Sequence, residues 1–133
     1  MKKTNNNMFK GQTANLLHYI RIICLEKHNI SQSEVSRHCS IDQRTVSRIE
    51  GHECITWGPM LNVFNYYCHF KGIKEKHAGF FNKLHHTSRI PDDVLVLLTD
   101  EHYDRSKIDE EYVQIYEEAF EVCKINFFSM DKK

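Results

Sequence analysis

Glycine and proline are scarce in this sequence, because the chain of 133 residues has 5 Gly and 2 Pro. β-Sandwiches and barrels need many tight turns, so this shortage argues against them and favours an all-α fold. The sequence also has no apolar run near the roughly 20 residues that cross a bilayer. No signal-peptide core follows Lys2 and Lys3. We therefore expect a cytoplasmic protein with no membrane partner.

Metal-binding and catalytic motifs are missing as well. The five cysteines are an odd number without a CxxC pair, so we expect reduced thiols at Cys24, Cys39, Cys54, Cys68 and Cys123. The 9 histidines lack ligand spacing such as HxxxH, and a structural zinc ion in the stretch 68–86 is only the lesser alternative. No nucleophile elbow, phosphate loop or paired-carboxylate arrangement is present. We expect no cofactor, no metal and no enzymatic activity.

Charge is balanced in total but unevenly distributed. The sequence has 18 Lys+Arg and 18 Asp+Glu, yet residues 1–72 carry nine basic and five acidic side chains. Residues 1–72 thus have a net charge of +4 and the remainder −4. Only the first part has the charge expected of a segment that binds a polyanion. The acidic stretch 92–121 is either a solvated face or, in a minority interpretation, a surface that docks a basic protein or mimics nucleic acid.

The chain divides into three parts by composition and pattern. Residues 1–10 are polar and predict a flexible arm, and residues 11–72 predict a compact helical domain. Residues 73–133 predict a helical extension that dimerises or binds a partner. Over residues 14–25, apolar residues recur at helical spacing and indicate the first helix. The expected architecture is a small all-α bundle.

Two short helices are predicted next from their capping residues. Ser31 followed three residues later by Glu34 is the capping-box pattern, which opens a helix ending near His38. Asp42 can cap the following helix, in which Val46 and Ile49 are expected to face inward, and Gly51 can end it. The turn between these two helices contains no glycine.

Single caps and apolar stripes predict the remaining helices. Thr56 can cap a helix whose expected core face consists of Trp57, Leu61, Phe64 and Cys68, with Met60 and Tyr67 flanking it. Further helices are predicted over 74–86, from Pro91, and from Asp109 to Phe128.

The last predicted helix has apolar residues that alternate steps of 3 and 4, which is the spacing of a seam between two helices. These residues are Val113, Tyr116, Phe120, Cys123, Phe127 and Met130. Such a seam packs either on the chain's own core or against a second copy. In the second case, the first five of these residues form a dimer interface.

The two short helices and their exposed Gln, Arg and Ser residues form a helix-turn-helix pattern. The stretch contains two characteristic blocks: Ser31-Gln32-Ser33-Glu34-Val35-Ser36, similar to SQ-x-E-L-A, and Ile41-Asp42-Gln43-Arg44-Thr45-Val46-Ser47-Arg48-Ile49-Glu50, similar to V-S-x-x-T-I-S-R-I-E. Through these blocks the sequence resembles the Xre/Cro-type helix-turn-helix family of phage repressors and related bacterial regulators. The resemblance covers about residues 14–70.

The sequence departs from the family pattern at a few positions. Ser36 and Ser40 stand where the family usually has Ala and Gly, and Gly51 follows Glu50 without the usual intervening residue. The dipeptide 58–59, Gly-Pro, is an unusual opening for the fourth helix. These departures concern loop geometry more than the fold.

The chemistry of the second short helix suits DNA. Arg can bridge O6 and N7 of guanine in the major groove, and Gln can do the same at N6 and N7 of adenine. The residues expected to contact bases are Gln43, Arg44, Ser47 and Arg48, of which the resemblance implies Gln43, Arg44 and Arg48. We assign phosphate contacts to Gln32, at the family's phosphate-contacting position, and to Ser33, Thr45 and His52.

We therefore expect a nucleoid-associated transcriptional regulator that reads operator DNA, acts as a repressor and binds as a homodimer. A single unit reads only a few base pairs, and dimerisation doubles the site. The alternative is an inhibitor or antitoxin-like protein. In that case the acidic C-terminal helices bind a protein partner and the helix-turn-helix serves autoregulation.

Overall fold

The computed structural model describes residues 6–53, 56–100 and 102–129, and over these residues the fold is all-helical, without strands. The α-helices are α1 (Asn6–Tyr19), α2 (Gln32–Cys39), α3 (Gln43–Glu50), α4 (Trp57–Tyr67), α5 (Ile73–His85), α6 (Asp92–Leu98) and α7 (Glu110–Cys123). A π-helical turn, η1 (Ile20–Cys24), extends α1. Short 3-10 turns are η2 (Glu26–His28), η3 (His86–Arg89), η4 (Arg105–Lys107) and η5 (Phe127–Ser129). The predicted all-α class is confirmed. None of the described helices has both the length and the apolar character needed to cross a membrane.

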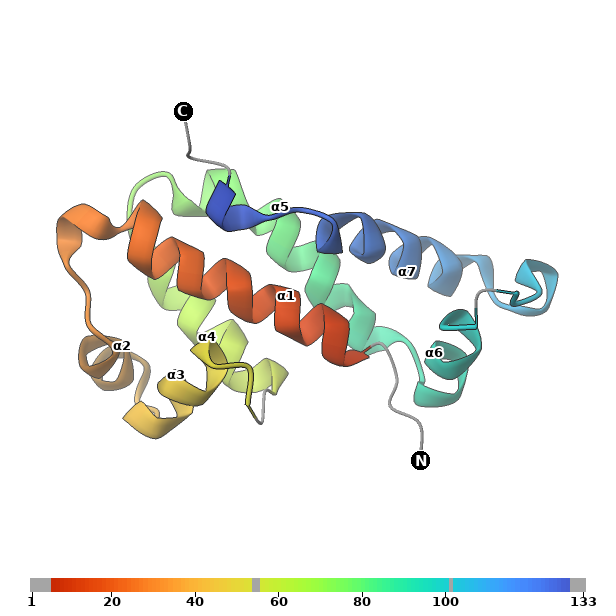
Figure 1. The fold of residues 1–133 in the computed structure, drawn as a ribbon, viewed down its shortest axis with the longest axis horizontal. Helices are drawn as coiled ribbons and strands as arrows, with labels where there is room; N and C mark the ends of the chain where they lie inside the picture. The colour runs from red at the N-terminus through yellow and green to blue at the C-terminus, as the bar shows by residue number, and fades with distance from the viewer. Residues whose placement is uncertain (1–5, 54–55, 101, 130–133) are drawn as a thin grey trace.

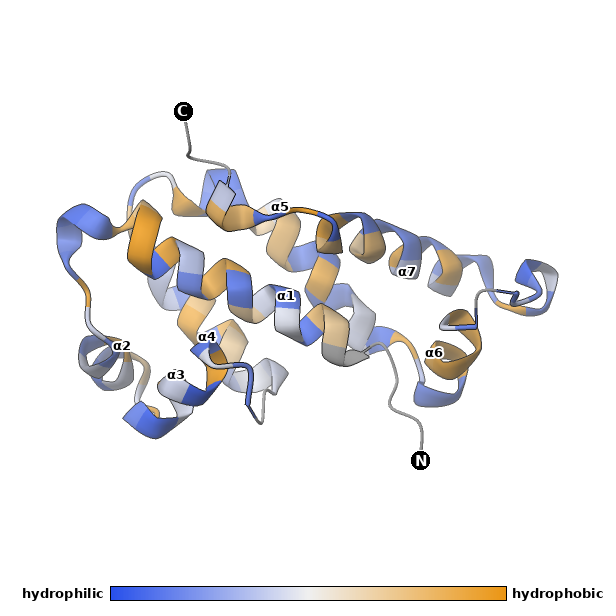
Figure 2. Ribbon diagram, viewed as in Figure 1, coloured by the Kyte–Doolittle hydropathy of each residue, from blue (hydrophilic) through white to orange (hydrophobic). Residues whose placement is uncertain are grey.

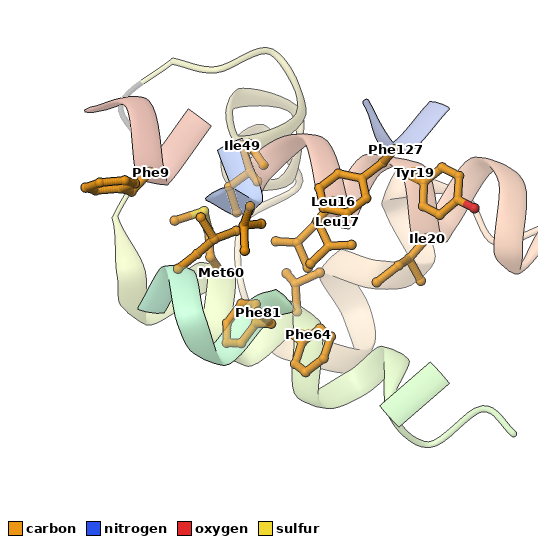
Figure 3. Packing of buried hydrophobic residues seen from close by; sticks show 14 of the residues in the cluster. Phe9, Leu16, Leu17, Tyr19, Ile20, Ile49, Met60, Phe64, Phe81 and Phe127 are labelled. Atoms are coloured by element: carbon orange, nitrogen blue, oxygen red, sulfur yellow. The ribbon is translucent and has the colours of Figure 1, made fainter. Parts of the chain in front are cut away.

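Helix α1 is the central element of the bundle. It packs against α4, α5 and α7 (Figure 1). Its residues Leu16 and Leu17, and Ile20 at the start of η1, are almost fully buried (Figure 3). The buried Gln12 side chain fixes α1 to the end of α7, because its Nε2 donates to the Val122 carbonyl oxygen at 2.9 Å. One hydrophobic cluster therefore spans the predicted domain and the predicted extension.

The prediction of a flexible arm over residues 1–10 is wrong for residues 6–10. Helix α1 begins at Asn6, and Phe9 is fully buried with its ring edge-on to Tyr116 at a centroid distance of 5.5 Å. Burying an aromatic side chain stabilises this first turn, although the sequence around it is polar. The first five residues of the expected arm, with Lys2 and Lys3, lie outside the described residues.

The prediction of which face of α4 is buried is wrong. Leu61 is 36% exposed, whereas Met60, Val63 and Tyr67 are buried. Phe64 is buried as expected and stacks on Phe81 of α5 at 4.2 Å between ring centroids. Apolar residues occur nearly all round this helix, so their spacing alone does not select the buried face.

The predicted seam of the last helix belongs largely to the chain's own core. Val113, Tyr116 and Phe127 are buried, and Cys123 is half-buried beside the Met8 carbonyl oxygen. These positions cannot form most of a dimer interface while the fold stays as it is. Among the described residues of this seam, only Phe120 is exposed, at 40%. The helix ends at Cys123 rather than Phe128, and Met130 lies outside the described residues.

Candidate nucleic-acid interface

Helices α2 and α3 lie together at one end of the molecule, and α6 lies at the other (Figure 1). The predicted caps of both helices are confirmed. The Ser31 hydroxyl accepts from the Glu34 amide at 3.1 Å, and the Glu34 carboxylate accepts from the Ser31 amide at 3.2 Å. The Asp42 carboxylate accepts from the Arg44 amide at 3.3 Å and opens α3. Local hydrogen bonds therefore place both helix starts.

The turn between α2 and α3 is made without glycine. Ser40, at the C-cap of α2, has φ 56° and ψ 41°, which is left-handed backbone. The Ser36 hydroxyl donates to the Ile41 carbonyl oxygen and ties the turn back to α2. Both serines that depart from the family pattern thus take part in the turn, and serine bears the steric cost that glycine avoids.

The inner face of α3 fixes the helix on the bundle. Val46 and Ile49 are buried in the core, as the sequence predicts. Neighbouring α2 is held at its end by α4, because Asn62 Nδ2 donates to the Cys39 carbonyl oxygen at 2.8 Å. These contacts leave the opposite face of α3 toward solvent, and Figure 2 shows α3 as mostly hydrophilic.

A polar network at the end of α3 joins three elements. Arg21 of η1 binds Glu50 with two hydrogen bonds, from Nε at 2.7 Å and from Nη2 at 2.8 Å. The Arg21 Nη1 also donates to the Ile30 carbonyl oxygen at 2.9 Å, and Gln32 Nε2 donates to Glu50 at 2.8 Å. The Glu50 side chain is only 7% exposed. A bidentate pair of this kind sets both distance and orientation between η1 and α3. The Gln32 hydrogen bond ties α2 to the same carboxylate.

The pKa values of this pair follow from its hydrogen bonds and burial. Burial alone raises the pKa of Glu50, but the hydrogen bonds from Arg21 and Gln32 outweigh burial and hold that pKa below its ordinary value. The hydrogen bond to Glu50 raises the pKa of Arg21 further above its ordinary value, against the opposing effect of burial. Both groups are therefore charged at neutral pH.

The four residues expected to contact bases share the outer side of α3. Gln43, Arg44, Ser47 and Arg48 are all exposed. Arg44 and Arg48 lie one helical turn apart on the same side. Neither guanidinium forms an ion pair or hydrogen bond with any residue that the structure describes. The helix thus presents two cations that no described residue neutralises.

The residues expected to contact phosphates are placed less uniformly. Ser33 is exposed and Thr45 is half-exposed. Gln32 is half-buried, and its amide is already bound to Glu50. His52 follows α3 in left-handed backbone, and its Nε2 lies 2.9 Å from Asn15 Oδ1. Ser33, Thr45 and His52 are thus at least partly open to solvent, whereas Gln32 contributes first to packing.

Sequence reasoning missed Arg21 and Glu50 as the residues that orient α3. The two are separated by 29 positions, so no local motif joins them. The sequence did contain one indication of this role. Both residues are charged, yet each lies beside the apolar stripe of its helical segment. A charged residue at such a position needs a partner when it is buried.

Comparisons with protein-family models, with curated proteins and with solved structures find no match. The family resemblance therefore rests on the residues of the chain itself, chiefly 31–51. Within the described part of the chain, no group of three or more His, Cys, Asp or Glu side chains is arranged to hold a metal ion.

Proposed function

We propose that this chain is a sequence-specific DNA-binding transcriptional regulator that represses by occupying an operator. In this proposal α2 and α3 form a helix-turn-helix, and α3 enters the major groove. The observation that carries this proposal is the exposed face of α3, where Arg44 and Arg48 have no ion-pair partner among the described residues. Glu50 anchors the same helix through its buried pair with Arg21. A rigid helix with unneutralised guanidinium groups fits the edges of guanine bases.

The proposed roles follow from position on the two helices. Gln43 and Arg44 occupy the first turn of α3, where a recognition helix comes nearest to the bases, and Ser47 and Arg48 follow one turn later. Ser33, at the start of α2, and His52, after α3, are exposed on either side for phosphate contacts.

Homodimerisation is part of the proposal because two copies read twice the number of base pairs. Of the five residues first expected at the dimer interface, Phe120 alone is exposed. The stoichiometry on DNA tests this part of the proposal.

Selection from random duplexes tests this function, because it yields the bound sequence, its symmetry and the stoichiometry together. We expect one enriched site, with two related half-sites if the protein binds as a dimer. Arg44→Ala or Arg48→Ala should lose about 1–3 kcal/mol of discrimination at one base pair of each half-site. Arg89→Ala removes an exposed arginine outside α2 and α3 and serves as the matched control, with unchanged preference. Absence of any enriched sequence contradicts the proposal, and equal weakening on all sequences reduces these arginines to phosphate contacts.

We propose a second candidate function, as an inhibitor or antitoxin-like protein, because of a groove beside α7. This cavity of about 660 Å³ is lined by Tyr103 and Phe120 together with Glu117, Glu118 and Glu121. Aromatic side chains flanked by carboxylates suit a basic, partly apolar segment of another protein. Here the helix-turn-helix would serve autoregulation.

Point variants test the second candidate better than truncation does, because α7 is part of the core. A short labelled peptide of lysine and leucine is the probe, followed by fluorescence anisotropy. We expect Glu118→Lys and Phe120→Ser to weaken its binding and Arg44→Ala to leave it unchanged. Equal binding by all three variants contradicts a site in this groove.

A further inference from the structure

A second cavity, of about 520 Å³, lies between η1 and the start of α5. Its lining includes Tyr19, Cys24, Lys71, Lys76, His77 and Phe80. The π-helical turn η1 ends at Cys24 and places the thiol at this cavity. Isolated π turns in helical proteins are uncommon and often occur at functional sites.

Cys24 and His77 form a close pair in this cavity. The Cys24 Sγ lies 3.5 Å from His77 Nε2, within hydrogen-bond reach for sulfur. Only 4% of His77 is exposed. Its ring and the ring of Tyr19 form a T-shaped contact with 5.9 Å between centroids. Packing therefore holds the imidazole beside the thiol.

The charged groups around the pair favour a thiolate. Lys71 precedes α5 and Lys76 lies on it, and both line the cavity. The other titratable neighbour is the phenol of Tyr19, from α1, and no carboxylate is among the described residues that line the cavity. Positive charge near a sulfur lowers the free energy of its ionised form.

The other described cysteines have different surroundings. Burial raises the pKa of the Cys39 and Cys68 thiols, and it raises that of Cys123 to about 11. The Cys39 and Cys123 sulfurs lie against backbone carbonyl oxygens instead of a base. Burial of these three cysteines therefore favours the protonated thiol, whereas Cys24 lies beside an imidazole.

We propose that Cys24 is a reactive thiol, activated by His77, that takes an α,β-unsaturated carbonyl compound as a covalent ligand. His77 Nε2 accepts the thiol proton, and the sulfur electron pair forms a bond to the β-carbon. The π-electron pair of the C=C bond moves onto the carbonyl to give an enolate, beside Lys71 and Lys76. The proton then passes from His77 to the α-carbon. The result is a neutral addition product. No group leaves, and the thiol and the ligand together undergo no net oxidation or reduction.

The position of the thiol gives the modification a route to α3. Arg21, which binds Glu50, precedes Cys24 by three residues in the same π turn. An adduct that distorts this turn would loosen the α3 anchor and weaken operator binding, a consequence that rests on the proposed function. The reactivity of Cys24 itself does not depend on DNA.

The test is alkylation of the full folded chain by substoichiometric N-ethylmaleimide, an α,β-unsaturated imide, with each cysteine peptide quantified by mass spectrometry. At pH 7 we expect Cys24 to react at least about tenfold faster than Cys39, Cys68 and Cys123. As pH falls, the rates of those three should drop about tenfold per pH unit, and the Cys24 rate should fall less. The Cys54 peptide is followed separately, because that residue lies outside the described residues.

Variants separate activation from simple exposure. His77→Gln should bring the Cys24 rate down about tenfold at pH 7 and give it the pH slope of the other thiols. Lys83→Gln, an exposed change elsewhere on α5, is the matched control and should leave the rate unchanged. If His77→Gln loses its helical circular dichroism, Lys76→Gln replaces it, with a smaller decrease expected. A Cys24 rate no greater than that of Cys68 in the unmodified sequence overturns the proposal.

Discussion

At the α6–α7 end of the molecule, Arg105 lies between two carboxylates, 2.9 Å from Glu110 and 2.8 Å from Glu117. At the α2–α3 end, Arg44 and Arg48 are equally accessible but meet no carboxylate among the described residues. Acidic residues of α7 thus pair with Arg89 and Arg105 within the chain, whereas the two arginines of α3 have no such partner among the described residues. Exposure alone does not mark a binding surface. The absence of an internal partner is the more informative feature.

The two ends also differ in how their ion pairs are built. The Arg21–Glu50 pair behind α3 is buried, bidentate and supported by Gln32. The Arg89–Glu111 pair at the other end joins two side chains that are more than half exposed. The first pair fixes the orientation of a helix, and the second contributes little to the fold.

The largest expected effect comes from breaking the buried pair. Glu50→Ala leaves the Arg21 guanidinium, whose side chain is 12% exposed, without its carboxylate partner. We expect the free energy of unfolding to fall by about 3–5 kcal/mol, measured by urea denaturation. Glu111→Ala is the matched control and should cost well under about 1 kcal/mol. Equal costs for the two variants would contradict the contrast between the ends.

A smaller part of the same energy should depend on pH. Because the pKa of Glu50 is lower in the folded chain than its ordinary value of 4.5, its ion pair stabilises the fold above that value. This contribution should be lost as pH falls through the lower, folded pKa. Urea denaturation between about pH 7 and pH 3 should show the stability advantage over Glu50→Gln shrinking below pH 4.5. An advantage that grows toward acid pH would show that Glu50 is not held ionised.

The turn at Ser40 should respond in the opposite direction, with a gain in stability. Its φ of 56° costs a residue with a Cβ atom energy that glycine does not incur. Ser40→Gly should therefore raise the free energy of unfolding by about 1 kcal/mol. Ser33→Gly, at an exposed site inside the first turn of α2, is the control and should lower it. A destabilised Ser40→Gly variant would indicate that the serine side chain stabilises the turn by more than its backbone conformation costs.

Sequence reasoning succeeded where the physical cause is local. The caps at Ser31 and Asp42 and the buried Val46 and Ile49 depend on residues within one helical turn, so spacing alone predicts them. The exposed face of α3 follows from the same periodicity. Whether that face binds DNA stays a prediction.

The parts that sequence reasoning missed depend on contacts between distant residues. Gln12 reaches the end of α7 across 110 positions, and Cys24 meets His77 across 53. The burial of Phe9, which removed half of the expected arm, depends in the same way on Tyr116. Such pairs are created by the packing of α1 against α5 and α7, and no single helix carries the information.

The smallest expected effect concerns charge at the α6–α7 end. Glu118 is exposed on α7, and Glu118→Lys changes the net charge by +2 on a helix other than α2 and α3. At physiological salt the Debye length is about 8 Å, so the change should alter operator affinity by no more than about twofold. At low salt the affinity should rise slightly on all sequences alike. Anisotropy titrations of selected and scrambled duplexes at two salt concentrations measure this. A changed base preference would place the α7 groove on the DNA and end the division of roles between the two ends.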